Sequence, residues 1–230
     1  MKIIYFAVFF GVCVAASIWM PWQWQNDFVR LLAWGVTGLG VSVMTYGLLS
    51  SGGASGLAVL ADPQNRLSLP NLVIVCWFVV IVSAYLAAAL FNFHLWDGSS
   101  PDLPLDIKIP ASIWVLAGIS VSHLAGTNIV VENKKLSRTL AVNAKASDAR
   151  PVDMFSYDEV GAANKLDLTA VQYLLFQIAA VIVYSVALGM LMFKTDVSKP
   201  ILQFPIIPDG FLALLGVSAA GNLVNRAVPR

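Results

Sequence analysis

The sequence predicts an all-α, polytopic membrane protein of about six transmembrane helices arranged as repeated helical hairpins. Three observations support this fold class: few charged residues, long uncharged stretches and an internal repeat. Of the 230 residues, 58% are hydrophobic and 12% are charged, and the mean hydropathy is +0.77. A soluble domain carries about 25% charged residues. Polar side chains are therefore too few to cover a globule in water, and lipid is expected to cover the rest.

Five uncharged stretches are long enough to cross about 30 Å of hydrocarbon. They cover residues 3–20, 31–49, 72–91, 111–131 and 168–193. A sixth stretch, residues 210–225, is shorter and is the weakest of the predicted spans. The first stretch follows Lys2 as the apolar part of a signal peptide would, but its length favours a retained membrane helix.

Basic residues predict the orientation, because Lys and Arg beside membrane helices are retained in the cytoplasm. With six spans and a cytoplasmic N-terminus, ten of the 14 basic residues fall on the cytoplasmic side and four on the outer side. We therefore expect both termini in the cytoplasm. The ten are Lys2, Arg66, Lys134, Lys135, Arg138, Lys145, Arg150, Lys165, Arg226 and Arg230, and the four are Arg30, Lys108, Lys194 and Lys199.

The predicted spans divide the chain into four segments. Residues 1–61 form an N-terminal membrane hairpin with a cytoplasmic linker, and residues 133–160 form a cytoplasmic loop. Residues 62–132 and 161–230 form two further membrane hairpins. The loop is too short to fold alone, so we expect it to pack on the membrane helices or on a partner.

The last two hairpins are expected to be copies of one unit in the same orientation. Residues 65–69 (Asn-Arg-Leu-Ser-Leu) match residues 164–168 (Asn-Lys-Leu-Asp-Leu) at an offset of 99 (164 − 65). Residues 110–120 match residues 208–218 at an offset of 98 (208 − 110). The Gly-Val-Ser at residues 40–42 leaves open a third copy in the first hairpin.

Small residues on the predicted helices form smooth faces that another helix backbone can approach closely. Ser68 and Asp167 precede two helix starts, where their side-chain oxygens are expected to cap the first amide groups. The residues expected to pack helices are Gly38, Ser42, Gly118, Ser120, Ser122, Gly216, Ser218 and Ala220.

The repeated pattern resembles a family of uncharacterised bacterial multi-pass inner-membrane proteins. In that pattern an Arg/Lys-Leu-Ser/Asp-Leu helix start is followed by a Pro-started helix with Leu-Gly-Val-Ser, and the resemblance covers most of residues 62–230. It implies a bacterial inner membrane and no known activity. The first helix of such a unit tends to carry Gln and Trp-Thr. The corresponding residues here are Val73 and Trp77-Phe78 in one copy, and Gln172 and Phe176-Gln177 in the other.

His123 lies near the middle of a predicted span, where a polar side chain is costly and hence a functional candidate. As a cofactor-binding residue it would ligate a haem or chlorophyll metal; it could also relay a proton or line a pore. A neutral imidazole bonded to a neighbouring helix is the simpler interpretation. Because the aligned residue in the other copy is Gly221, the repeat does not require a histidine there.

The sequence contains few residues that would support ion-coupled transport, catalysis or metal binding. No Asp, Glu, Lys or Arg lies well inside a predicted span, which argues against an ion-coupled transporter. Phosphate-binding loops, zinc-binding helices and nucleophile elbows are missing, and Cys13 and Cys76 lie in separate apolar stretches without neighbouring ligands. The polar residues that a conduit would use are Gln172, Gln177, Tyr184, Asn128 and Asn222, although bonds between helices explain them equally well.

We therefore expect a non-enzymatic membrane subunit that assembles through its small-residue faces into a homo-oligomer or a larger membrane complex. A passive channel or transporter with a pore between repeats or subunits is the alternative, and a haem- or chlorophyll-binding subunit is a minor one. The expected partners are the lipid bilayer and membrane proteins. The net charge of +1 excludes nucleic acid, and no cofactor is expected.

Overall fold

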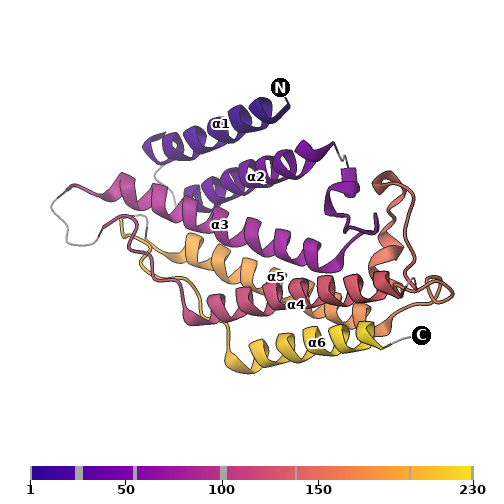
Figure 1. Cartoon of the computed structure of the whole chain (residues 1–230). Helices are drawn as coiled ribbons and strands as arrows, with labels where there is room; N and C mark the ends of the chain where they lie inside the picture. The colour runs from indigo at the N-terminus through magenta and orange to yellow at the C-terminus, as the bar shows by residue number, and fades with distance from the viewer. Residues whose placement is uncertain are drawn as a thin grey trace. The chain divides into compact units, whose positions relative to one another are not determined.

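The computed structural model describes residues 2–23, 28–53, 56–98, 103–137, 139–196 and 198–228. Within these ranges the chain forms six α-helices, and its only β contacts are isolated bridges. The predicted all-α class is confirmed. Arg138 and Arg230, which contribute to the predicted orientation, lie outside the described residues. The helices are α1 (Lys2–Gln23), α2 (Val29–Leu49), α3 (Leu69–Leu95), α4 (Ala111–Leu136), α5 (Leu168–Lys194) and α6 (Asp209–Ala227) (Figure 1).

Five of these helices, α1 to α5, are long and apolar enough to cross a membrane. Large apolar side chains are exposed along them, such as Val121 and Ile129 in α4 and Ile182 in α5. Apolar surface of this extent requires lipid as its solvent, so the chain is a membrane protein with several spans. α6 forms where the sixth span is predicted but is not one of the five, and its crossing stays a prediction.

Both α3 and α5 begin one residue after the polar side chain that is predicted to cap them. The Asn71 N–H donates to Ser68 Oγ at 3.4 Å. The N–H groups of Thr169 and Ala170 donate to Asp167 Oδ1 at 2.9 and 3.3 Å. These bonds confirm the predicted caps, and capping explains why α3 begins before the uncharged stretch from which it was predicted.

The chain divides into two compact units. Unit 1 comprises Met1–Ser51, Trp77–Ala111 and Val181–Ile206, and unit 2 comprises Gly52–Cys76, Ser112–Ala180 and Ile207–Arg230. α3 and α5 therefore contribute residues to both units. The four segments predicted from the sequence are a different division, and they stay a prediction.

In unit 1, α1 packs on α2 at two glycines. A Cβ atom at Gly40 would lie 2.8 Å from the Cβ of Cys13, and one at Gly47 would overlap the ring of Phe6. Ser17 Oγ also donates to the carbonyl of Ala33 at 3.2 Å. Helix backbones that approach this closely have room for hydrogen alone as a side chain.

Cys13 and Cys76 are both free thiols.

Arg30 in unit 1 departs from expectation, because it was predicted to lie in an outer loop and is instead buried in the first turn of α2. Its guanidinium donates to the carbonyls of Thr195 and Lys199 at 3.3 and 2.5 Å. The same group lies over the ring of Phe91, 4.8 Å from its centroid. Thr195 and Lys199 follow the end of α5 at Lys194. Arg30 thus provides hydrogen-bond donors to the carbonyls of the segment after this helix.

In unit 2, the same local structure precedes α3 and α5. A five-residue 3₁₀-helix comes first, η2 (Gly56–Leu60) before α3 and η4 (Pro151–Phe155) before α5. An isolated antiparallel bridge follows, Ala61 with Leu67 in one case and Ser156 with Leu166 in the other. The last residue before each helix then donates its N–H to the last carbonyl of the 3₁₀-helix. These two turns thus end on the two capping residues.

Candidate functional site in unit 2

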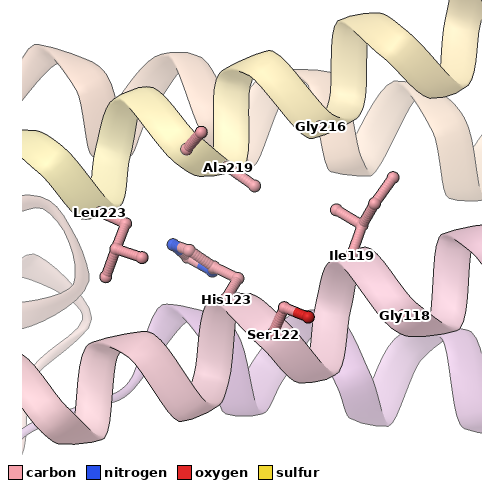
Figure 2. Close-up of a pocket in the computed structure, with 8 residues that line it drawn as sticks. Gly118, Ile119, Ser122, His123, Gly216, Ala219 and Leu223 are labelled. Atoms are coloured by element: carbon pink, nitrogen blue, oxygen red, sulfur yellow. The ribbon is translucent and has the colours of Figure 1, made fainter.

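A groove of about 410 Å³ lies between α4 and α6 on the surface of unit 2. Figure 2 shows the two helices on either side of it, with the His123 ring pointing from α4 toward α6. It is lined by Gly118, Ile119, Ser122, His123, Gly216, Ala219, Ala220 and Leu223. Four residues predicted to pack helices thus line a single groove: Gly118, Ser122, Gly216 and Ala220.

The two helices run parallel along this groove. Ile119 of α4 lies against Gly216 of α6, and His123 lies against Asn222, so the residue numbers rise together in both helices. Parallel helices of a membrane protein enter the bilayer from the same side. Equivalent positions of α4 and α6 are therefore neighbours at similar heights in unit 2.

The glycines of α4 and α6 differ in how closely other side chains approach them. A Cβ atom at Gly126 would lie 2.5 Å from Leu223 Cδ2, so the helices are close there. One at Gly216 would meet Ile119 only at 3.7 Å, and one at Gly118 would meet nothing within 4 Å. The predicted packing role of Gly118 is therefore not used inside the described chain, where its backbone is open to the groove.

The other predicted packing residues lie elsewhere. Gly38 and Ser42 belong to unit 1, where Ser42 Oγ donates to the Gly38 carbonyl at 2.7 Å and is exposed. Ser120 and Ser218 are buried in unit 2 and do not line the groove. One turn of helix separates Ser120 from His123 on α4, and one turn separates Ser218 from Asn222, the partner of His123, on α6.

His123 is 2% exposed and is held by two neighbouring helices. Its Nε2 lies 3.1 Å from Asn222 Oδ1 of α6, and its ring lies 4.4 Å from the ring of Tyr173 of α5, between centroids. A carbonyl oxygen only accepts, so Nε2 carries the proton and Nδ1 of the neutral ring is an acceptor. The bond to Asn222 of α6 agrees with the simpler interpretation of this residue, and metal ligation stays a prediction.

A ladder of hydrogen bonds leads from His123 to the start of α5. Asn222 Nδ2 donates to Thr169 Oγ1 at 3.3 Å, and Thr169 Oγ1 donates to Asp167 Oδ1 at 2.6 Å. Asn225 Nδ2 donates to the same two oxygens at 3.1 and 2.8 Å. The capping carboxylate of α5 therefore also anchors α6.

Three helices thus turn polar residues toward one interior, with spacings of three or four residues that keep each set on one helix face. The sequence gives no sign of which faces meet, and Thr169, Tyr173 and Asn225 were not predicted as site residues. The three sets are Ser120, His123 and Thr127 of α4, Thr169, Tyr173 and Gln177 of α5, and Ser218, Asn222 and Arg226 of α6.

A buried charge cluster lies beyond this ladder. Asp158 of the loop lies 3.6 Å from the guanidinium of Arg66 and 3.4 Å from that of Arg226. Lys134 at the end of α4 pairs with Glu159 at 2.9 Å. The loop is thereby fastened to α4 and α6, as expected of a segment too short to fold alone.

Asp62 belongs to the turn that carries Arg66. Burial raises the pKa of its carboxyl, although the N–H groups of Gln64 and Arg66 donate to it at 2.8 and 3.1 Å. The turn therefore holds a carboxylate in a partly desolvated place, and backbone bonds offset part of the cost.

The five polar residues predicted for a conduit do not lie together in the structure. Gln177 and Asn222 are buried in unit 2, and Tyr184 is buried in unit 1. Gln172 and Asn128 are exposed on the lipid-facing side of their helices. Only Gln177 and Asn222 belong to the polar interior. Most residues of that interior are therefore not those predicted for a conduit.

Among the described residues, no group of three or more His, Cys, Asp or Glu side chains is placed to hold a metal ion. No family model, no curated protein and no solved structure matches this chain.

Proposed function

We propose that the protein is a non-enzymatic integral membrane subunit that assembles with a second copy of itself through the groove between α4 and α6. The observation that carries this proposal is the open backbone of Gly118, next to the exposed Ser122 and Ala220. Lipid offers no hydrophobic gain for helix association, so packing relies on close backbone approach at small residues. A groove lined by such residues suits a helix better than it suits a lipid chain.

A second copy is the partner that the groove favours. Val121 of α4 and Val217 of α6 are exposed, and each is next in sequence to a residue that lines the groove. We expect them to form ridges beside it. A two-fold interface is self-complementary, so the ridge of one copy can enter the groove of the other. Each copy then supplies both halves of the contact, and no further protein is needed.

The membrane topology is part of the same proposal. We place both termini in the cytoplasm of a bacterial inner membrane, with α6 as the sixth span. Support comes from α6 running parallel to α4, which is long and apolar enough to cross. Both helices also end on basic residues, Lys134 and Lys135 in α4 and Arg226 in α6, as expected at a cytoplasmic surface.

We also propose that the two hairpins arose by duplication. The matched turns before α3 and α5 support this, and they extend the similarity to η2 and η4, ahead of the predicted starts. In unit 1, Tyr85 donates to the Leu105 carbonyl at 3.1 Å and Tyr184 to the Pro205 carbonyl at 3.4 Å. The offset of 99 aligns these two tyrosines, so aligned side chains make equivalent bonds 20 and 21 residues downstream.

Bulky substitutions in the groove test the assembly. Gly118→Leu and Gly216→Leu should weaken self-association about tenfold or more, because a leucine side chain fills the space of the partner helix. Native mass spectrometry of the purified protein across a dilution series measures this. The matched control is Gly221→Leu, since Gly221 lies on α6, has nothing within 4 Å of its Cβ position and does not line the groove.

The proposal fails if Gly118→Leu and Gly216→Leu associate like the unsubstituted protein, or if Gly221→Leu dissociates equally. Thermal unfolding of all three variants in the same detergent shows whether a loss of dimer reflects a loss of fold.

A further inference from the structure

The polar interior of unit 2 contains hydrogen-bonding groups that the described chain leaves unpaired. They are Ser120 Oγ, His123 Nδ1, Tyr173 Oη and Ser218 Oγ, all buried and without a partner among the described residues. Each of these residues is more than nine-tenths buried. Buried polar groups in proteins are bonded to protein, to water or to a ligand, so four together indicate a site.

Helix geometry gathers the four groups at one level. Tyr173 stacks on His123, whose Nε2 bonds Asn222. Ser120 lies one turn before His123 on α4, and Ser218 lies one turn before Asn222 on the parallel α6. Residues one turn apart on the same face are about 5–6 Å apart at Cβ. Three helices therefore contribute unpaired polar groups at a similar level.

We propose that this interior binds a small neutral molecule with hydrogen-bonding groups, of the size of water or a simple amide or alcohol. Three hydroxyls both donate and accept, and Nδ1 of the imidazole accepts, so the ligand must offer at least one donor. A charged ligand would have no counter-charge at this level of the site. His123 also lines the groove, so this site lies next to the proposed assembly surface.

Beyond the serines the interior becomes apolar. Leu116 precedes Ser120 by one turn, and Leu215 precedes Ser218 by one turn. Both leucines are fully buried. The polar interior of unit 2 therefore ends at a leucine layer, and we expect the site to stop there rather than continue as a pore through the unit.

The opposite end of the site faces the charge cluster. Arg226 lies one turn beyond Asn222 on α6, and the carboxylate of Asp158 lies 3.4 Å from it. Asp158 also reaches Arg66, so a residue of the loop covers this end. Access from the loop side then depends on the bonds of Asp158.

Cysteine accessibility tests the site with a probe of the proposed class. In protein carrying Cys13→Ala and Cys76→Ala, Ser120→Cys or Ser218→Cys replaces a hydroxyl by a thiol of similar size. Iodoacetamide, a small neutral amide, should alkylate both about tenfold faster than it alkylates Leu116→Cys or Leu175→Cys, because a thiol in an apolar layer stays protonated. Leu175 is an exposed residue of α5 away from the groove. Mass spectrometry of protein in nanodiscs follows the rates.

Asp158→Asn should raise the rate at Ser218→Cys further, whereas Glu159→Gln, which removes the neighbouring pair with Lys134, should leave it unchanged. Equal and slow alkylation of Ser120→Cys, Ser218→Cys and Leu175→Cys, with and without Asp158→Asn, would overturn the proposal. So would equally fast alkylation of Leu116→Cys, because a loosened fold rather than a site would then admit the probe.

Discussion

At the scale of single residues, Arg30 shows how a charge is accommodated beside the membrane in unit 1. The guanidinium is fully enclosed, yet it meets two backbone carbonyls and an aromatic face. Carbonyls after the end of a helix carry partial negative charge, so they compensate a cation without a carboxylate. This arrangement fastens the start of α2 to the segment after α5.

Replacement of Arg30 by Met should lower the stability of unit 1 by about 1.5–3 kcal/mol, the usual contribution of a hydrogen bond to a charged group. Methionine keeps most of the side-chain length and loses the donors. Thermal unfolding in detergent measures the change. Lys199→Met is the control, because the Lys199 side chain is exposed and only its carbonyl contacts Arg30; equal melting temperatures of the two variants would contradict the prediction.

Residue roles were only partly predictable from the sequence. The caps at Ser68 and Asp167 could be predicted, because capping depends on residues within one turn. The burial of Arg30 could not, since its partners are 165 and 169 residues away. Thr169 and Asn225 were missed for the same reason: their importance depends on which helix faces meet.

At the scale of helices, most elements were predictable, because an uncharged stretch must have a minimum length to cross the hydrocarbon of a bilayer. The stretches at residues 3–20, 111–131 and 168–193 correspond to α1, α4 and α5, which extend beyond them by a few polar residues. Packing was less predictable, because small residues occur on several faces of each helix. Gly40 and Gly47 make the close contacts between α1 and α2, whereas a Cβ atom at the predicted Gly38 would meet Ser83 only at 3.7 Å.

Gly40→Ala should therefore destabilise the packing of α1 on α2. Its new methyl group would meet the Cβ of Cys13, which cannot rotate away, and overpacking of this kind costs about 1–3 kcal/mol. The melting temperature in detergent should fall. Gly35→Ala on the same helix should leave it unchanged, since nothing lies within 4 Å of a Cβ there.

The double variant Gly40→Ala with Cys13→Gly tests the cause, because it removes the clashing Cβ. Recovery of part of the lost stability is expected, while no recovery would mean that the loss arises elsewhere.

At the scale of the whole molecule, the proposed topology predicts labelling from opposite sides of the membrane. In a background of Cys13→Ala and Cys76→Ala, a membrane-impermeant maleimide added to intact cells should label Leu105→Cys. It should label Ala144→Cys and Val228→Cys only after the membrane is opened, because the loop and the end of α6 are expected in the cytoplasm. All three positions are exposed.

Labelling of Ala144→Cys in intact cells would reverse the orientation. Labelling of Val228→Cys alone would show that α6 does not cross the bilayer, and the molecule would then have five spans.

The hydrogen bonds of Arg30 also determine when unit 1 can complete its folding during translation. α1 and α2 leave the ribosome first, but the carbonyls of Thr195 and Lys199 are made about 165 residues later. Until these two carbonyls exist, the guanidinium of Arg30 is expected to lie among the lipid headgroups, where its long side chain keeps the charge hydrated. Unit 1 can therefore reach its final form only after Lys199 has been translated, so α1 and α2 settle well after they are inserted.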